Sequence, residues 1–253
     1  MKPGRTILLV EDEPTLQRIF GSVLSDVGHQ VEAVGTAEHA LERLQNTAQP
    51  EIDLVLSDKN LPGKTGLDLL AETRRIEAAS RRSIGFMLVT GYPSRDSALD
   101  VLSADGDGYL VKPFRSLMHA VEQVKGVVSL DLAARRAAGV LARRVARAVR
   151  GDDPGALAGV SVALLIDDKG TRDAVVDRLT AAGAGIAQAR SVPDVSSQVL
   201  VAPRIEDLIA VGKARPGTSL VLLDAGASFQ DIVGLIGAGG GALSDLGLLG
   251  APR

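Results

Sequence analysis

Polar residues that could bind a cation and transfer charge stand at the ends of four short apolar runs in this chain. They are the pair Glu11-Asp12, then Asp58, Thr90 and Lys112. Clustered carboxylates repel one another unless a cation lies among them, and oxygen ligands of this kind favour Mg²⁺. A lysine adds a positive point charge, and a hydroxyl can donate a hydrogen bond to an anion. Brought together, these groups would suit phosphoryl transfer with Asp58 as the nucleophile.

These side chains can meet only if the apolar runs are parallel strands of one sheet. The run Leu54–Leu56 is typical of a strand buried on both faces, and Pro62-Gly63 forces a turn soon after it. Strand-like runs alternate with helix-period stretches through the first half, which predicts an α/β fold with a doubly wound parallel sheet. The carboxyl ends of such strands share one edge, where ligands bind in open α/β sheets.

Each residue taken alone has an ordinary explanation. Thr90 would usually be a strand-end residue, Lys112 a solvated lysine, and Tyr109 a half-buried packing residue. Their joint occurrence at successive strand ends is what favours a site. The three histidines fall on different predicted elements without ligand spacing and are expected at the surface; they are His29, His39 and His119.

The motifs ILLVEDEP, DLVLSDKNLPGKTGLDLL, MLVTGYPS and GYLVKPF resemble the receiver domain of two-component response regulators. The resemblance covers roughly residues 5–128 and holds at every motif in the right order. It implies a flavodoxin-like fold with five strands in the order 2-1-3-4-5. It also implies that Asp58 accepts a phosphoryl group from a histidine kinase or a histidine phosphotransfer protein.

The resemblance further implies a Mg²⁺ site. Asp12 would bind the metal directly, Glu11 through water, and Asn60 through its backbone carbonyl oxygen, with Asp58 completing the protein ligands. Glutamate at position 11, where aspartate is commoner in the family, lengthens one arm of this site.

Three more residues take roles from the same resemblance. Thr90 would hydrogen-bond to the phosphoryl oxygens, and Lys112 would pair with their charge. Tyr109 stands at the position of the switch aromatic, which turns inward as Thr90 moves. The bond Lys112-Pro113 matches a cis peptide, a geometry that is costly for anything but X-Pro.

An alanine- and arginine-rich helical stretch follows the receiver-like region, and Gly151–Gly155 then marks a boundary. Its arginines are Arg135, Arg136, Arg143, Arg144, Arg147 and Arg150. Three readings compete: a solvated linker helix whose apolar stripe packs on a partner or a neighbouring domain, a dimerising coiled segment, and a surface for nucleic acid or acidic lipid. The expected organisation is a receiver at 1–128, a basic helical linker at 129–155, and a smaller α/β domain at 156–253.

The second half looks like a degenerate, truncated receiver. Ala163–Asp168 aligns with Ile7–Asp12 at an offset of 156 (163 minus 7), and Ser219–Asp224 aligns with the strand that ends at Asp58. The LPG turn and the later Thr and Lys-Pro are missing, so docking or dimerisation is the expected role, and phosphorylation of Asp224 stays open. The run Ile236–Ala242 fits GxGxxA, which hints at dinucleotide binding, but it is read as a loose tail or loop.

Composition limits the remaining function classes. The chain has 253 residues, a formal charge of -3 and no cysteine, which excludes disulfides and thiolate metal sites. The apolar run Ile7–Val10 is too short for a signal peptide or membrane span, so a cytosolic protein without membrane contact is expected. Aromatic residues at 2% make stacking platforms for single-stranded nucleic acid improbable.

The sequence therefore predicts a response regulator that assists its own phosphorylation rather than a true enzyme, with a homodimer through the linker helix or second domain as an option. The alternative is a transcriptional regulator that binds DNA through the arginines of residues 135–150. An aspartate-nucleophile phosphatase is disfavoured, because such enzymes need an acid two residues after the nucleophile and Asn60 stands there.

Overall fold

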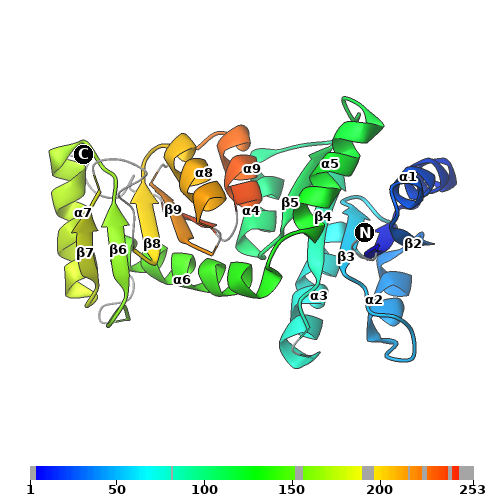
Figure 1. The fold of residues 1–253 in the computed structure, drawn as a ribbon, viewed down its shortest axis with the longest axis horizontal. Coiled ribbons are helices and arrows are strands. Elements are labelled where there is room, and N and C mark those ends of the chain that lie inside the picture. Colours follow the sequence, from blue (N-terminus) through cyan, green and yellow to red (C-terminus); the bar gives the residue numbers. More distant parts are fainter. Residues whose placement is uncertain are drawn as a thin grey trace. The chain divides into compact units, whose positions relative to one another are not determined.

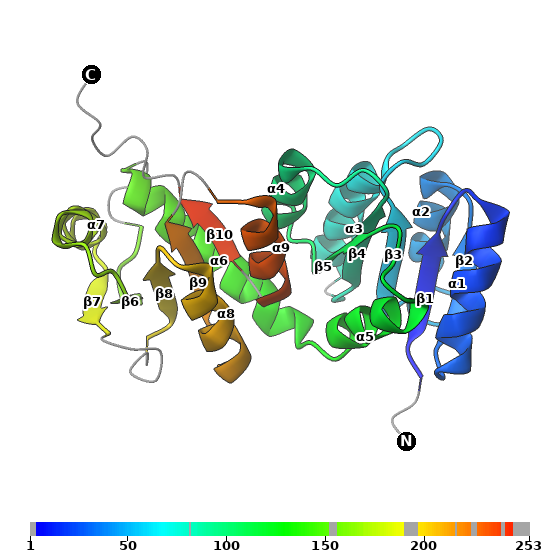
Figure 2. The same cartoon turned by 90° about the horizontal axis from the view of Figure 1, so that it is seen from above.

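The computed structural model describes residues 4–80, 82–151, 156–189, 197–215, 217–223, 227–238 and 241–244. The chain divides into two compact units, Met1–Leu132 and Ala133–Arg253 (Figures 1 and 2).

The first unit is a five-stranded parallel sheet covered by five helices. Its elements are β1 (Thr6–Val10), α1 (Pro14–Asp26), β2 (Gln30–Val34), α2 (Ala37–Gln45), β3 (Leu54–Asp58), α3 (Gly66–Ser80), β4 (Gly85–Thr90), α4 (Arg95–Ser103), β5 (Gly108–Val111) and α5 (Leu117–Val128). The strand order is β2-β1-β3-β4-β5, so the predicted flavodoxin-like order is confirmed.

Helices cover both faces of this sheet. One face carries α1 and α5, whose buried side chains, such as Phe20, Leu24 and Val124, join Leu54 and Leu56 of β3 in one apolar cluster. The other helices, α2, α3 and α4, lie on the opposite side of the strands (Figure 2). With both faces covered, the strands are almost continuously apolar, as the sequence indicated.

A glycine lets α3 begin close behind the end of β3. A Cβ atom at Gly66 would overlap the main-chain oxygen of Asp58, and the side chain of Leu88 lies nearly as close. The Gly66 N–H donates to the Lys59 oxygen at 2.9 Å. Only glycine therefore allows this close approach, which closes the loop that carries Asp58 against the sheet.

The second unit contains another five-stranded parallel sheet, in the order β10-β9-β8-β6-β7. Its elements are α6 (Leu132–Arg150), β6 (Ser161–Leu164), α7 (Lys169–Ala181), β7 (Gly185–Gln188), β8 (Val199–Ala202), α8 (Ile205–Ala214), β9 (Ser219–Leu223), α9 (Phe229–Ala238) and β10 (Gly241–Ser244). Read from β7, this order repeats that of the first sheet. The expectation of a truncated domain is therefore wrong, because a fifth strand is present.

The alignment of Asp224 with Asp58 is also wrong. The strand β9, which precedes Asp224, is the fourth strand of its sheet, because β8 lies between it and β6. The strand β8 has only four residues, and Pro203 follows it directly, so no receiver motif marks it in the sequence. Asp224 itself lies outside the described residues.

The glycine-rich stretch near the end of the chain does not follow a strand. The apolar run before it is the helix α9, which ends at Ala238, and Gly241 begins β10. A dinucleotide motif needs a strand, a turn and then a helix, so this hint is contradicted. Reading Gly241 as part of a loose tail is wrong for the same reason, because it pairs with Leu220 of β9.

The arginine-rich helix α6 is part of the second unit's core. Val145 and Val149 are fully buried and pack with Val162 and Leu164 of β6. Figure 1 shows α6 running across the strands β6, β8 and β9. The apolar stripe of α6 packs on the sheet of the second unit, as one of the readings expected. The helix is an integral part of that unit and not a solvated linker. Val140 of the same helix, in contrast, is 51% exposed.

Two arginines of α6 bind main-chain oxygens inside the second unit. Arg135, only 6% exposed, donates to the oxygen of Ile236, and Arg144 donates to that of Ala156. These contacts give both side chains a structural role.

Candidate functional site

Three strands of the first sheet bring charged side chains together at their carboxyl edge. Glu11 follows β1, Asp58 ends β3, and Lys112 follows β5. The Lys112 ammonium donates to Glu11 Oε2 at 2.6 Å and also forms an ion pair with Asp58. The side chains of Lys112, Glu11 and Asp58 are 17%, 8% and 12% exposed, so this three-residue cluster is largely removed from water. We call it the carboxyl-edge cluster.

The electrostatics of the cluster follow from burial and proximity. Burial raises the pKa of Glu11 above its ordinary value of 4.5; Lys112 opposes this rise, and the Asp58 charge adds to it. Burial lowers the pKa of Lys112, but hydrogen bonds to Asp58 and Glu11 outweigh that effect and hold it above 10.5. Lys112 is therefore an ammonium ion that is shared by two acidic side chains. A further cation would be attracted to the cluster.

Local backbone contacts hold the segments that carry Lys112 and Asp58 in place. The Lys112 N–H donates to the Thr90 oxygen at 2.8 Å, and the Lys59 N–H donates to the Val89 oxygen at 2.8 Å. The Lys112-Pro113 bond is cis, as the resemblance implied. The Asn60 N–H donates to Asp58 Oδ1 at 3.0 Å, which orients the aspartate carboxylate.

Thr90 ends β4, and Tyr109 lies on β5, the strand that precedes Lys112. Thr90 is fully buried, and its Oγ1 accepts a hydrogen bond from the N–H of Tyr92, whose ring is 77% exposed. The Tyr109 hydroxyl lies 2.6 Å from Ser97 Oγ on α4, and its side chain is buried. Sequence reasoning missed Ser97. The pattern Ser94-x-x-Ser97 marks the start of a helix, but it does not show that the second serine reaches Tyr109.

The expected convergence of three carboxylates is met only in part. Glu11 and Asp58 meet at Lys112, whereas Asp12 is exposed. Within the described ranges, the structure assembles no group of three or more His, Cys, Asp or Glu side chains that could hold a metal ion. The donor chemistry still fits Mg²⁺, because Glu11 and Asp58 offer hard carboxylate oxygens that lie together with one balancing cation.

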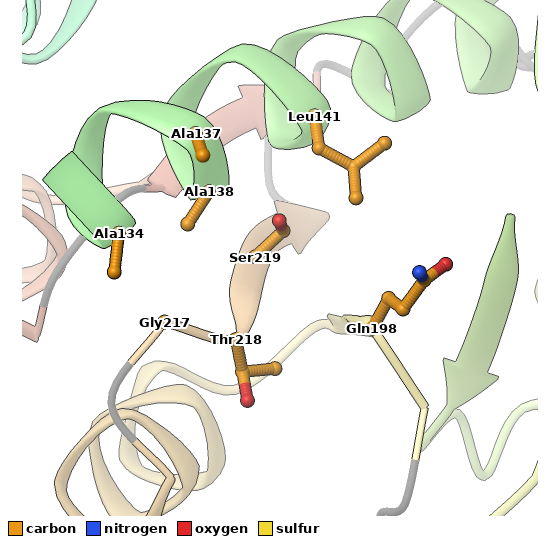
Figure 3. A pocket seen from close by; sticks show the side chains of 8 residues that line it. All are labelled: Ala134, Ala137, Ala138, Leu141, Gln198, Gly217, Thr218 and Ser219. Carbon is orange, nitrogen blue, oxygen red and sulfur yellow. The ribbon is translucent and has the colours of Figure 1, made fainter.

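The second unit contains a groove. Its volume is about 450 Å³, and it is lined by Ala134, Ala137, Ala138, Leu141, Gln198, Gly217, Thr218 and Ser219. Figure 3 shows the apolar side chains of α6 on one side and Thr218, Ser219 and Gln198 on the other. None of these lining residues is charged or nucleophilic beyond a hydroxyl, so the groove offers no counterpart of the carboxyl-edge cluster.

None of the helices in the described part of the chain is both long and apolar enough to cross a membrane.

Comparisons with known proteins identify the first unit. Residues 7–122 match the family model of the response regulator receiver domain. The two-component response regulator PhoP of Pseudomonas aeruginosa is 36% identical over 109 residues, which are 43% of this chain and 45% of PhoP. The chemotaxis protein CheY of the same bacterium is 32% identical over 120 residues, 47% of this chain and 94% of CheY. A CheY-like receiver domain structure from Methanospirillum hungatei JF-1 shares 26% identity and covers 50% of this chain and 94% of its own, with a TM-score of 0.45.

The first unit therefore has the fold of a response regulator receiver domain. Because its first unit covers nearly all of CheY at 32% identity, the chain belongs to the response regulator receiver domain family of two-component systems. The family model matches residues of the first unit, and the chain spans less than half the length of PhoP.

Proposed function

We propose that the first unit accepts a phosphoryl group on Asp58 from the phosphohistidine of a histidine kinase or a histidine phosphotransfer protein. The observation that carries this proposal is the Asp58 carboxylate at the end of β3, held beside the Lys112 ammonium. A carboxylate oxygen would attack phosphorus as the bond from phosphorus to the imidazole nitrogen breaks. The leaving imidazole gains one proton from water, so the products are an aspartyl phosphate and a neutral histidine.

Two side chains and one backbone N–H group would support this step. Lys112 would neutralise charge on the transferred group, since its ammonium already contacts Asp58. The Asn60 N–H, which donates to Asp58 Oδ1, would hold the nucleophile in one orientation. Thr90, buried at the end of the neighbouring β4, would donate its hydroxyl to a phosphoryl oxygen.

Mg²⁺ would be held by Asp58, Glu11 and Asp12 with the backbone oxygen of Asn60. When bound, it would supply positive charge against the phosphoryl oxygens. Glu11 and Asp58 support this assignment, because their carboxylates lie together at the carboxyl edge with Lys112 between them.

Phosphorylation can be tested by intact-protein mass spectrometry after incubation with acetyl phosphate and Mg²⁺. We expect the wild-type chain and Asp224→Asn to gain the mass of one phosphoryl group, and Asp58→Asn to gain none. Omission of Mg²⁺ should abolish labelling. Labelling of Asp58→Asn to the wild-type extent would overturn the assignment of Asp58.

We further propose that the second unit is a degenerate receiver without a phosphoacceptor. The helices α1 and α7 each have 13 residues and start 155 positions apart (169 minus 14). At this offset, one below the sequence-based value, Gln17 matches Arg172. Gln17 donates to the Glu11 oxygen, and Arg172 donates to that of Ile166. The same loop-to-helix contact thus recurs in both units.

Strand pairing supports a residue-by-residue correspondence between the two units. Val162 pairs with Val199 as Ile7 pairs with Leu54. Four residues further along each strand, Ile166 stands in the place of Glu11 and Pro203 in the place of Asp58. A proline has no nucleophilic oxygen, so the second unit would contribute protein contacts rather than phosphotransfer. One phosphoryl group per chain is the expected stoichiometry.

DNA binding through residues 135–150 gains no support from the structure. The internal contacts of Arg135 and Arg144 explain two of the six arginines without nucleic acid. A gel shift at several salt concentrations would reveal such binding by its salt dependence.

A further inference from the structure

Gln17 holds both ends of the short segment that carries Asp12. It is the fourth residue of α1, and its N–H donates to the Glu13 oxygen at 3.0 Å. Its side chain turns back and donates from Nε2 to the Glu11 oxygen at 2.5 Å. Because a main-chain oxygen can only accept, the NH₂ group of the amide must face it. We call these two contacts the Gln17 bracket.

The bracket fixes the backbone between two acids that would bind Mg²⁺. The Glu11 oxygen belongs to the planar peptide unit that joins Glu11 to Asp12. On the other side of Glu11, its N–H donates to the Val34 oxygen at 3.0 Å. Both peptide units that flank the Glu11 Cα atom are therefore held, which restricts the directions in which the Glu11 and Asp12 side chains leave the backbone.

The loop before α1 lacks the side-chain cap that holds other helix starts in the same unit. The N-cap residue Glu13 makes no side-chain capping hydrogen bond, and Pro14 follows it without an N–H group. The helices α2, α4 and α5 each have a serine or threonine at the N-cap whose side chain accepts from a main-chain N–H. The support of the Asp12 segment therefore comes from Gln17, inside the helix.

A similar bracket encloses Asp167 in the second unit. Arg172 donates from its N–H to the Asp168 oxygen at 3.0 Å and from Nη1 to the Ile166 oxygen at 3.2 Å. Ile166 stands in the place of Glu11, so no acid precedes the enclosed aspartate there. Stabilisation of the loop alone would account for the bracket in both units. Orientation of two acids for a cation is a separate role, which only the first unit could have and which metal affinity reports.

We propose that Gln17 is a positioning residue that orients the acidic pair Glu11-Asp12 and so raises the affinity of the first unit for a divalent cation. The inference rests on the Mg²⁺ site of the proposed function. Asp12 is exposed, so without the bracket its carboxylate would sample many directions. A cation would then have to order the segment on binding, and this cost would weaken its affinity. Loss of a contact that supports a metal ligand typically lowers metal affinity roughly 10- to 100-fold.

Mn²⁺ is a suitable probe, because it also prefers carboxylate oxygens and its free ion is counted in solution by electron paramagnetic resonance. Gln17→Met removes the donor amide at nearly the same side-chain length and helix propensity. Gln123→Met is the matched control, because Gln123 is exposed on α5. Competition by Mg²⁺ and the variant Asp12→Asn show whether the bound Mn²⁺ lies at the acidic pair. All measurements use the full chain without a phosphodonor.

We expect the wild-type chain to bind Mn²⁺ that Mg²⁺ displaces, and Gln123→Met to bind it with the same affinity. Gln17→Met should bind it about tenfold more weakly or worse, and Asp12→Asn should lose most of this binding. Circular dichroism confirms that each variant is folded. Urea unfolding in metal-free buffer measures the contribution of the bracket to the fold separately from its contribution to metal affinity.

Equal Mn²⁺ affinity in Gln17→Met and Gln123→Met would overturn the inference, even if Gln17→Met unfolds at lower urea, because the bracket would then serve the fold alone. That result would leave the proposed Mg²⁺ site standing. Absence of displaceable Mn²⁺ in the wild-type chain, or undiminished binding in Asp12→Asn, would instead overturn the inference together with the Mg²⁺ site. The two failures are therefore distinguishable.

Discussion

At the residue scale, the carboxyl-edge cluster is defined by an imbalance of charge. One ammonium, Lys112, serves two acids that are mostly shielded from water. Attraction between ions strengthens as water is excluded, but an ion that loses its partner there is strongly destabilised. Lys112 is therefore the residue on which the local stability of all three strand ends depends.

Replacing Lys112 by Met should lower the free energy of unfolding by about 1–3 kcal/mol, because Glu11 and Asp58 would then repel each other without a cation. Lys125→Met is the control: Lys125 pairs with Glu122 on α5, with side chains 42% and 61% exposed. An exposed pair contributes less than about 1 kcal/mol. Urea unfolding of both variants measures the difference, and equal losses would show that the cluster does not stabilise the fold.

Glu11 should make stability depend on pH. Its folded-state pKa is raised above 4.5 by burial, so the folded chain binds the Glu11 proton more tightly than the unfolded chain. Stability from this group is present below pH 4.5 and is lost as pH rises through the higher folded pKa. Glu11→Gln removes the titration. Wild type should therefore lose stability relative to this variant as pH rises above 4.5 in urea unfolding series. A difference that stays constant with pH, or that grows in favour of wild type, would contradict the shift.

Much of this site could be predicted from single residues. The part that could not be predicted depends on distances between elements, which the sequence does not contain. Asp58, Glu11 and Lys112 were found because each ends an apolar run, and parallel strands bring such ends to one edge. Ser97 was missed because its importance depends on the distance between α4 and β5. No spacing along the chain encodes that distance.

At the element scale, the turn between β3 and α3 depends on one glycine. Gly66→Ala should destabilise the chain by about 1–3 kcal/mol, because the new methyl group would overlap the Asp58 oxygen and press on Leu88. Gly126→Ala is the matched control within α5, where nothing lies within 4 Å of the new Cβ atom. There alanine should stabilise by about 0.5–1 kcal/mol, through higher helix propensity.

Thermal or urea unfolding of the two glycine variants should give shifts of opposite sign. A neutral Gly66→Ala would mean that the loop carrying Asp58 can move away from the sheet at little cost.

The strands of the first unit are easier to recognise from the sequence than those of the second unit. In the first unit four of the strands end at, or one residue before, a charged or hydroxyl side chain, so their order could be inferred. In the second unit β8 has four residues and is followed directly by Pro203, where the first unit has Asp58. When β8 is not counted, β9 becomes the third strand instead of the fourth. Asp224 is then aligned with Asp58, which is the wrong position. A motif-based alignment therefore fails where the motif has been lost but the strand remains.

At the scale of the whole molecule, α6 determines where the chain can be divided. In the first unit the face shared with α1 is covered by α5, which follows the last strand. In the second unit the corresponding face, shared with α7, is covered by α6, which precedes the first strand. The sequence placed this helix outside both domains, because an amphipathic pattern shows that a helix has an apolar face but not which sheet it covers.

Dissection of the chain tests this assignment. A fragment of residues 1–131 and a fragment of residues 132–253 should each unfold cooperatively, because each retains its own apolar cluster. A fragment of residues 151–253 would expose the surface covered by Val145 and Val149. Loss of even one such buried valine costs roughly 1–3 kcal/mol, so loss of the whole helix should exceed the stability of a small domain. Circular dichroism during urea unfolding should show no cooperative transition for 151–253. A transition matching that of 132–253 would instead make α6 a dispensable linker, and Val145→Ala in the full chain would then have no effect on the second unit.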